Sequence, residues 1–290
     1  MISDSILILG ASGLVGNMLY RVLSENPTIP VYGIVRSESS KEFFISSLSN
    51  NMICVSNIFS IENILKLFEL TKPSIVINCI SVGRPIPNDY SCLIPVLSIF
   101  PRRLSYLCKS MNIRLINISS DGVFSGKQGN YCEIDTPDAE DAYGCAKLLG
   151  EVPYDALTFR TSFIGPELNN KFGLLEWVIS QTGECTGYPF SVFSGVTTLE
   201  FGKFLRDIVI PCINLKGLFH VASTPCSKFD LLKMIKAEYD LDIKVIPDTS
   251  LSVNRSLNAG MLKALTGYSP PTWGEMLHSL REYNFGLRDI

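Results

Sequence analysis

The sequence has 290 residues, of which 46% are hydrophobic and 18% charged, and a formal net charge of −3. Two histidines, His220 and His278, are too few for a multi-histidine metal site, so the sequence predicts no metal site, and a Ser-His-Asp relay would need one of those two. The mild acidity argues against a nucleic acid or an anionic membrane as partner, because both select a basic surface. We therefore expect a soluble globular protein whose chemistry comes from other residues.

The first 160 residues alternate short β-rich runs with longer amphipathic stretches. Six runs have the apolar composition of buried strands: Ser5–Leu9, Val31–Val35, Met52–Val55, Ser74–Asn78, Arg114–Ile118 and Ala156–Arg160. Helical spacing occupies the intervals between them, as in Val15–Ser24, Ile61–Leu70 and Arg103–Ser110. Continuous apolar strands separated by helices indicate βαβ units and a parallel sheet covered on both faces. With right-handed crossovers, this pattern predicts an α/β fold with a doubly wound, Rossmann-type sheet.

The alternation weakens after Gly165, where glycine, asparagine, threonine and aromatic residues are mixed. Gly217–Ala222 reads as a further strand that returns to the sheet, and Lys228–Tyr239 and Pro270–Tyr283 read as helices. We expect a dinucleotide-binding domain over residues 1–165, with 208–222 returning to it. Residues 166–207 and 223–290 then form a smaller, interleaved substrate-binding lobe.

The sequence has nine cysteines, an odd number; they are scattered along the chain, and no two have C-x-x-C spacing. This pattern favours reduced packing cysteines in a cytoplasmic protein over a disulfide or zinc framework. The apolar run Ile6–Leu9 is too short for a signal peptide, and the uncharged stretch Tyr90–Pro101 is too short to cross a membrane. We therefore expect a cytoplasmic location and no membrane partner.

A glycine-rich loop, G-x-x-G-x-x-G, follows the first predicted strand and opens the first helix. Glycine allows the tight turn, lets the backbone approach a pyrophosphate, and lets the helix pack close to the strand. The helix N-terminal amides and the helix dipole then bind the phosphates. The loop predicts a dinucleotide site whose residues are Gly10, Ser12, Gly13, Leu14, Val15 and Gly16.

The end of the second strand distinguishes the two nicotinamide cofactors. NAD selects an acidic residue there for the ribose 2′-hydroxyl, whereas this chain has Arg36-Ser37, with Lys41 further on. A guanidinium beside a hydroxyl suits a 2′-phosphate, so the sequence favours NADP(H). The other interpretation, that Arg36 is a solvated loop residue, leaves NAD(H) open.

Tyr143 and Lys147 lie at i and i+4, so on a helix they share a face and act on the same ligand. A nearby ammonium stabilises a phenolate, so a lysine one helical turn away suits a tyrosine that transfers a proton. Ser120 ends a predicted strand, where its hydroxyl can hold a substrate carbonyl opposite the tyrosine. The three residues form a candidate catalytic set.

With these motifs in place, the chain resembles the extended short-chain dehydrogenase/reductase family over essentially its whole length. The resemblance implies that Ser120, Tyr143 and Lys147 are catalytic and that Tyr143 and Lys147 also contact the cofactor. Asn78 matches a cofactor-flanking position, and Asn57 stands where the family often has an aspartate near the adenine. The further cofactor contacts that it implies are Ile58, Cys79, Ile80 and Ser81.

Longer motifs resemble the dTDP-4-dehydrorhamnose reductase family more narrowly. They are Ser119–Gly126, Gly129-Asn130-Tyr131, Glu133, Tyr143, Lys147–Glu151, Phe159–Ser162 and Arg255–Leu257. The resemblance implies NADPH-dependent reduction of the C4 keto group of a nucleotide-linked 4-keto-6-deoxy sugar, in the supply of surface-polysaccharide precursors. Two residues depart from the family pattern: Ser120 replaces a threonine, and Gly122 replaces a tyrosine near the substrate, which puts the identity of the sugar in doubt.

Other activities of this scaffold remain alternatives. Dehydratases of the family follow the hydroxyl residue with Asp-Glu, and Asp121-Gly122 lacks that glutamate; an epimerase usually favours NAD, against which Arg36 weighs. A non-catalytic NADP-binding subunit or sensor has no need of the complete catalytic set.

Several further residues carry two interpretations. Asp121 is a substrate-side group or a cap, and Arg255 binds a nucleotide phosphate or forms a surface ion pair. His220, Trp177 and Trp273 read as packing residues. The oligomeric state stays open, a homodimer included.

Overall fold

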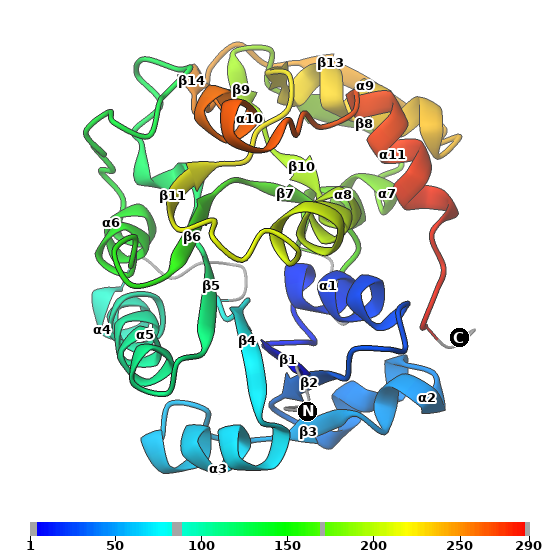
Figure 1. The fold of residues 1–290 in the computed structure, drawn as a ribbon. Coiled ribbons are helices and arrows are strands. Elements are labelled where there is room, and N and C mark those ends of the chain that lie inside the picture. Colours follow the sequence, from blue (N-terminus) through cyan, green and yellow to red (C-terminus); the bar gives the residue numbers. More distant parts are fainter. Residues whose placement is uncertain (1–4, 83–88, 169–171, 288–290) are drawn as a thin grey trace.

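A seven-stranded parallel sheet runs through the computed structural model, which describes residues 5–82, 89–168 and 172–287 (Figure 1). Its order is β11-β6-β5-β4-β1-β2-β3, and every neighbouring pair is parallel. The strands are β1 Ser5–Leu9, β2 Val31–Val35, β3 Met52–Cys54, β4 Pro73–Asn78, β5 Arg114–Ile118, β6 Leu157–Arg160 and β11 Gly217–His220. The predicted α/β doubly wound fold is confirmed, and each predicted strand end lies within two residues of the observed one.

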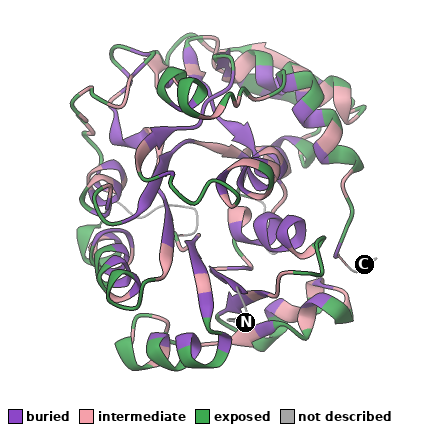
Figure 2. Cartoon of the chain, viewed as in Figure 1, coloured by how far each residue is buried: buried purple, intermediate pink, exposed green. Residues whose placement is uncertain are grey.

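Both faces of the sheet are covered, as continuous apolar strands require. In β1, Ile6 and Ile8 belong to one apolar cluster and Leu7 and Leu9 to another, because successive side chains of a strand point to opposite faces. The strands accordingly form a buried layer between helices with exposed outer faces (Figure 2). The helices of this part are α1 Leu14–Ser24, α2 Ser46–Ser49, α3 Ile61–Thr71, α4 Tyr90–Ile94, α5 Phe100–Ser110 and α6 Ala142–Leu149.

The helix predicted from Arg103 starts one turn earlier, as α5, and is continuous with α4 through a π-helical segment, Pro95–Ile99. Prolines lack the backbone N–H and clash with the preceding turn, and the wider π turn accommodates Pro101. The uncharged stretch Tyr90–Pro101 therefore forms α4, the π-helical segment and the first residues of α5. Within the described ranges, no helix combines the length and apolar character needed to cross a bilayer.

We call the residues after β6, apart from β11, the second part of the chain; where the structure describes them, they form three small sheets and five α-helices. Its strand pairs are β10 Val196–Thr197 with β7 Phe163–Ile164, β9 Ser191–Phe193 with β12 Cys226–Ser227 and β14 Val253–Asn254, and β13 Ile243–Pro247 with β8 Gly183–Gly187. Its helices are α7 Leu174–Ile179, α8 Thr198–Phe204, α9 Lys228–Glu238, α10 Gly260–Thr266 and α11 Trp273–Glu282. Residues 169–171 and 288–290 of the predicted lobe lie outside the described residues.

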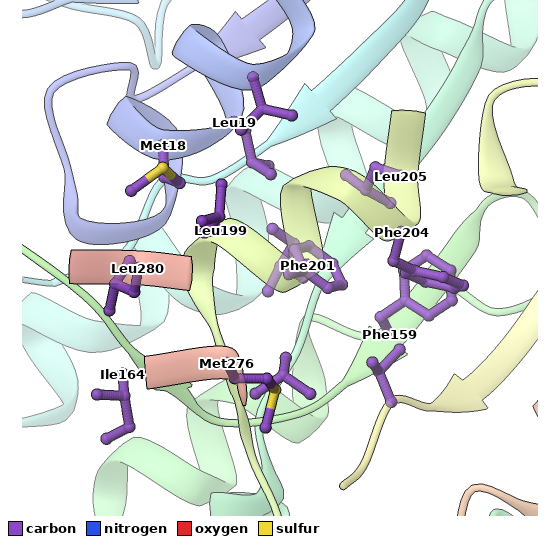
Figure 3. Packing of buried hydrophobic residues seen from close by; sticks show 14 of the residues in the cluster. Met18, Leu19, Phe159, Ile164, Leu199, Phe201, Phe204, Leu205, Met276 and Leu280 are labelled. Carbon is purple, nitrogen blue, oxygen red and sulfur yellow. The ribbon is translucent and has the colours of Figure 1, made fainter. Parts of the chain in front are cut away.

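Helix α8 joins the two parts through one apolar core. Phe201 and Phe204 of α8 contact Phe159 of β6, and Leu199 lies in the same cluster as Met18 of α1 and Leu280 of α11 (Figure 3). Residues 166–207 were predicted to belong to the lobe, and α8 within them packs directly on α1, the first helix of the nucleotide-binding part. The core between the lobe and the sheet is continuous.

The C-terminal tail forms a second connection between the parts. Buried Arg21 of α1 donates from Nε to the carbonyl oxygen of Phe285 over 2.5 Å, and its guanidinium lies 4.7 Å from the centre of the Tyr283 ring. Phe44 and Leu287 form an antiparallel bridge beyond it. The tail therefore returns from α11 to the β2 side of the sheet, where it comes into view beside α2 (Figure 1).

Candidate functional site

A cleft of about 1540 Å³ lies at the carboxyl edge of the sheet and is lined by both parts of the chain. The strand order reverses between β1 and β4, and open α/β sheets bind ligands at such a switch point. Residues following β1, β2, β4, β5 and β6 line one side of the cleft. Residues from the second part line the other: Glu167, Leu168, Phe172, Gly173, Leu174, Trp177, Thr186, Gly187, Tyr188, Ser191, Val192, Phe193, Lys228, Leu232, Val253 and Arg255.

The glycine-rich loop turns from β1 into α1 at the floor of this cleft. Gly10 has φ +81°, a conformation that favours glycine, and its N–H donates to the carbonyl of Ile34. Gly13 is the N-cap of α1 and no side chain caps the helix, so the first amides of α1 remain available to a ligand. Gly10, Ser12, Gly13, Leu14 and Val15 line the cleft.

Gly16 acts differently from the rest of the loop. It does not line the cleft, and a β-carbon at this position would lie 2.0 Å from the carbonyl oxygen of Gly10. Its role is close packing of α1 against the turn. The next residue, Asn17, is buried and donates to the carbonyls of Gly13 and Pro166, which links the loop to the start of the second part.

The rim after β2 has a basic character. Val35, Arg36, Ser37 and Ser40 line the cleft there, and Arg36 is exposed with no carboxylate partner among the described residues. The nearby acid, Glu38, is paired with Lys41 over 2.9 Å. This rim offers a guanidinium and hydroxyls to a ligand.

Asn57 does not line the cleft, although its neighbours Ser56, Ile58 and Phe59 do. Its side-chain oxygen accepts from the N–H of Phe59, and its carbonyl accepts from Asn63. The structure therefore uses Asn57 to shape the turn before α3. Of the two cofactor contacts predicted here, Ile58 lines the cleft and Asn57 does not.

After β4, the cleft is lined by Cys79, Ile80 and Ser81. Asn78, the last residue of β4, also lines the cleft; it is mostly buried, and its amide donates to the side-chain oxygen of Asn117 on β5 over 2.9 Å. Asn117 in turn donates to the carbonyl of Gly150 at the end of α6. These two amides hold the ends of β4, β5 and α6 together.

The candidate catalytic residues meet beside the ends of β4 and β5. Asp141 caps α6 by accepting from the N–H of Gly144 over 2.8 Å, which places Tyr143 in the first turn and Lys147 one turn later. Lys147 is buried, and its Nζ donates to the carbonyl of Ile118 over 3.2 Å. All three residues, Ser120 included, line the cleft.

Gly122 lies next to both the Ser120 hydroxyl and the Tyr143 ring. A β-carbon placed on Gly122 would lie 3.2 Å from Ser120 Oγ and 3.5 Å from Tyr143 Cε1, so both side chains border one point of the cleft. Ser120 Oγ accepts from the N–H of Gly122 and donates to Asp121 over 3.2 Å. The serine hydroxyl is thus held beside the tyrosine, and it can turn from Asp121 towards a ligand oxygen.

Two cations of the second part, Arg255 and Lys228, lie near the Asp121 carboxyl. Burial raises the pKa of the Asp121 carboxyl, and the positive charges of Arg255 and Lys228 oppose that rise. Arg255 pairs with Asp141 over 3.2 Å, while its buried Nε has no partner. The pair connects β14 of the second part to the cap of the helix that carries Tyr143.

A buried ion pair supports the strand ends behind the catalytic residues. Arg160 makes two bonds of 2.8 Å to Glu151, and Ser119 Oγ donates to the same carboxylate over 2.7 Å. His220 lies against Arg160 at 3.5 Å, with its Nδ1 3.0 Å from the carbonyl of Tyr131. Burial and then the charge of Arg160 lower the pKa of His220 to about 4.

From the sequence, the members of this group were predicted only as motif residues and His220 as a packing residue; His220 is fully buried in the structure. The sequence did not predict that Glu151 and Arg160 pair. It also favoured packing for Trp177 and Trp273. Trp273 is buried against Phe193, while Trp177 is half-buried and lines the cleft. Within the described part of the chain, no three His, Cys, Asp or Glu side chains are placed to bind a metal ion.

Comparison with known proteins gives one family and one fold. The model of the RmlD substrate binding domain family matches residues 4–173. The methionine adenosyltransferase 2 beta subunits of Xenopus tropicalis and Xenopus laevis are 28% identical over 149 residues and 30% identical over 147 residues. Each match covers 50% of this chain and 41% of the relative, so the chain spans less than half of their length.

Solved structures match nearly the whole chain. A dTDP-4-dehydrorhamnose reductase from Bacillus anthracis str. Ames, in complex with NADP, has a TM-score of 0.78 at 21% identity, over 96% of this chain and 98% of that one. A dTDP-4-dehydrorhamnose reductase from Yersinia enterocolitica has a TM-score of 0.71 at 19% identity, over 96% and 98%. A dTDP-glucose 4,6-dehydratase from Bacillus anthracis str. Ames, in complex with NAD, has a TM-score of 0.76 at 15% identity, over 96% and 95%. At these identities the likeness establishes the fold.

Proposed function

Because the chain belongs to the RmlD substrate binding domain family, within the extended short-chain dehydrogenases and reductases, we propose that it is an NADPH-dependent reductase. Its substrate in this proposal is a nucleotide-linked 4-keto-6-deoxy sugar, reduced at the C4 keto group. The observation that carries the proposal is the position of Ser120, Tyr143 and Lys147 in the same cleft as the uncapped start of α1.

The residues present fit a dinucleotide. The open amides of α1 and the turn at Gly10 suit a pyrophosphate, and the ends of β4 and β5 lie beside them for the nicotinamide half. The β2 rim has Arg36, Ser37 and Ser40 and contributes no carboxylate to the cleft. A guanidinium with neighbouring hydroxyls favours the 2′-phosphate of NADPH over the free hydroxyls of NADH. When bound, NADPH supplies the hydride for C4.

The protein's own residues then handle the substrate oxygen. Tyr143 donates its phenolic proton to that oxygen, and Ser120 Oγ donates a hydrogen bond to it after turning from Asp121. Lys147 gives one N–H to Ile118, which fixes its position and leaves two for the cofactor ribose. Its positive charge favours the phenolate that proton transfer leaves behind.

The second side of the cleft is suited to the nucleotide part of the substrate. Arg255 has a buried Nε without a partner and lines the cleft together with Lys228, so two cations face the ligand space. Phosphate oxygens of a nucleoside diphosphate are the acceptors that an arginine fork prefers. The predicted ion pair of Arg255 and its phosphate role are compatible, because the pair with Asp141 uses Nη2 and the side chain stays 33% exposed.

Turnover is tested with the purified protein, NADPH and a panel of nucleotide-linked 4-keto-6-deoxy sugars. We expect loss of NADPH absorbance and appearance of the C4 alcohol with at least one member, and a higher kcat/KM with NADPH than with NADH. An epimerase would interconvert two sugars without net NADPH consumption. Binding of NADPH without turnover of any member would contradict a reductase.

A second candidate, a cofactor-bound subunit of a larger enzyme, is favoured by the names of the curated relatives, which are beta subunits of an adenosyltransferase. This candidate predicts NADPH binding, no turnover, and stable association with a catalytic partner. The same assay therefore separates the two candidates, with analytical ultracentrifugation in the presence of a methionine adenosyltransferase catalytic subunit as the second measurement.

A further inference from the structure

Gly122 lies between the two groups that hold the substrate oxygen in the proposed reaction. It follows Ser120 in the short 3-10 helix Asp121–Val123, is buried, and lines the cleft. A β-carbon there would meet Ser120 Oγ at 3.2 Å and the Tyr143 ring at 3.5 and 3.6 Å. The nearest neighbours of a side chain at this position are therefore the two candidate catalytic groups themselves.

The backbone does not require glycine here. Seven other glycines within the described ranges have positive φ, but Gly122 does not, so alanine is compatible with its conformation. The N–H of Gly122, which donates to Ser120 Oγ, is present in every residue except proline. What glycine contributes at this position is space beside the hydroxyl and the ring.

We propose that Gly122 determines substrate specificity, by leaving room for the substituent on C3, the ring carbon next to the reacting C4 carbonyl that carries a hydroxyl. This inference rests on the proposed reductase function. Ser120 and Tyr143 both bind the carbonyl oxygen in that reaction, so the atoms attached to the neighbouring ring carbons come closest to the empty position. A methyl group from alanine would occupy the volume that such a substituent needs, and the favoured substrate is a keto sugar substituted at that carbon.

The experiment compares wild type, Gly122→Ala and Gly122→Val on two substrates: a nucleotide-linked 4-keto-6-deoxy sugar and its 3-deoxy analogue, which lacks the hydroxyl beside the carbonyl. One methyl group in a tight pocket costs roughly 10- to 200-fold in kcat/KM. We expect a loss of at least about tenfold for Gly122→Ala on the substituted sugar, a much smaller loss on the analogue, and a larger loss for Gly122→Val.

Gly274→Ala is the matched control. Gly274 is exposed near the start of α11, does not have positive φ, and would place its β-carbon in open space, so its kcat/KM should equal that of wild type. NADPH affinity and the unfolding midpoint of each variant show whether the fold and the cofactor site persist, and we expect both to stay at wild-type values for Gly122→Ala.

The outcomes separate this inference from the proposed function. Wild type that reduces neither sugar overturns the reductase and, with it, this role of Gly122. Active wild type with unchanged Gly122→Ala overturns the specificity role alone. Equal losses on both substrates also overturn it, because they mean that alanine displaces Ser120 or Tyr143 rather than excluding a substituent.

Discussion

The two sides of the cleft are built in different ways. The sheet side presents backbone amides and strand-end residues, supported by strands whose two faces are both buried. The other side presents side chains from strands of two to five residues, such as β14 and β8, that pair with partners far away in the sequence. The sheet side suits a constant ligand such as a dinucleotide, and the other side suits a variable one.

This difference predicts which substitutions should affect only the cofactor or only the sugar substrate of the proposed function, and which should affect both. In the proposed function, groups on the sheet side serve chemistry and cofactor and Arg255 serves the substrate. The buried pair Glu151–Arg160 lies behind the strand ends that carry these groups. Four tests, the last of them a pair of substitutions, probe this division from the largest expected effect to the smallest.

Tyr143→Phe tests the reacting end of the sheet side. Removal of the phenolic proton should lower kcat by about 100- to 10,000-fold, the usual contribution of a general acid, while NADPH affinity is retained. Tyr154→Phe, at a 99% exposed tyrosine, is the control and should leave kcat unchanged. A Tyr143→Phe variant with wild-type kcat would remove the tyrosine from the chemistry.

Glu151→Ala tests the support behind both sides. It leaves Arg160 charged and buried without its carboxylate, which costs about 3–5 kcal/mol of unfolding free energy. The control is Glu62→Ala, which breaks an exposed pair with Lys66 and should leave the denaturation midpoint unchanged. Chemical denaturation of the three proteins measures the difference. Equal midpoints for both variants would show that the buried pair does not stabilise the fold.

Acid stability tests the same support through His220. Burial and Arg160 lower its pKa from 6.5 to about 4, so the unfolded chain binds the proton more tightly than the folded one. The neutral imidazole therefore stabilises the fold fully above pH 6.5, and up to roughly 3 kcal/mol is lost as the pH falls to 4.

A His220→Gln variant should lose less stability than wild type over that window, as measured by denaturation at each pH. Burial also raises the pKa of Glu133, which bonds the His220 backbone, and that carboxyl contributes with the opposite sign in both proteins. Parallel stability curves for wild type and variant would show that His220 does not titrate on unfolding.

Arg36→Ala and Arg255→Ala form a reciprocal pair that tests the division directly. Loss of a charge-assisted bond at a partly exposed site should raise KM by about tenfold. We expect the rise for NADPH alone in Arg36→Ala, with NADH unaffected, and for the nucleotide sugar alone in Arg255→Ala. Steady-state kinetics with each ligand varied measures both, and a rise for both ligands in either variant would contradict the division.

The sheet could be predicted because its strands are buried on both faces. Runs such as Ser5–Leu9 are apolar after their first residue, and this local pattern is enough to identify them. β8, with the sequence GECTG, is mostly exposed and becomes a strand only by pairing with β13. Neither strand of that pair carries a strong signal of its own, so the lobe was described by its helices alone.

The candidate site divides in the same way. Ser120, Tyr143 and Lys147 could be named from spacing because strand ends and helical turns fix where such residues lie, whereas Asn57 was assigned to the cleft and lies outside it. Glu151 and Arg160 could be named only as members of sequence motifs, since nothing local shows that both are buried and paired. Phe172, Tyr188 and Lys228 of the cleft gave no signal, because their position depends on how the second part folds back.

The sequence by itself determined the doubly wound sheet, the glycine turn into α1 and the Tyr143–Lys147 spacing, because each depends on residues near one another in the chain. Only the tertiary structure decided that Gly122 adjoins both Ser120 and Tyr143, that Glu151 pairs with Arg160, and that α8 packs on α1. These contacts join distant segments and depend on which surfaces the fold brings together, which local propensity does not encode.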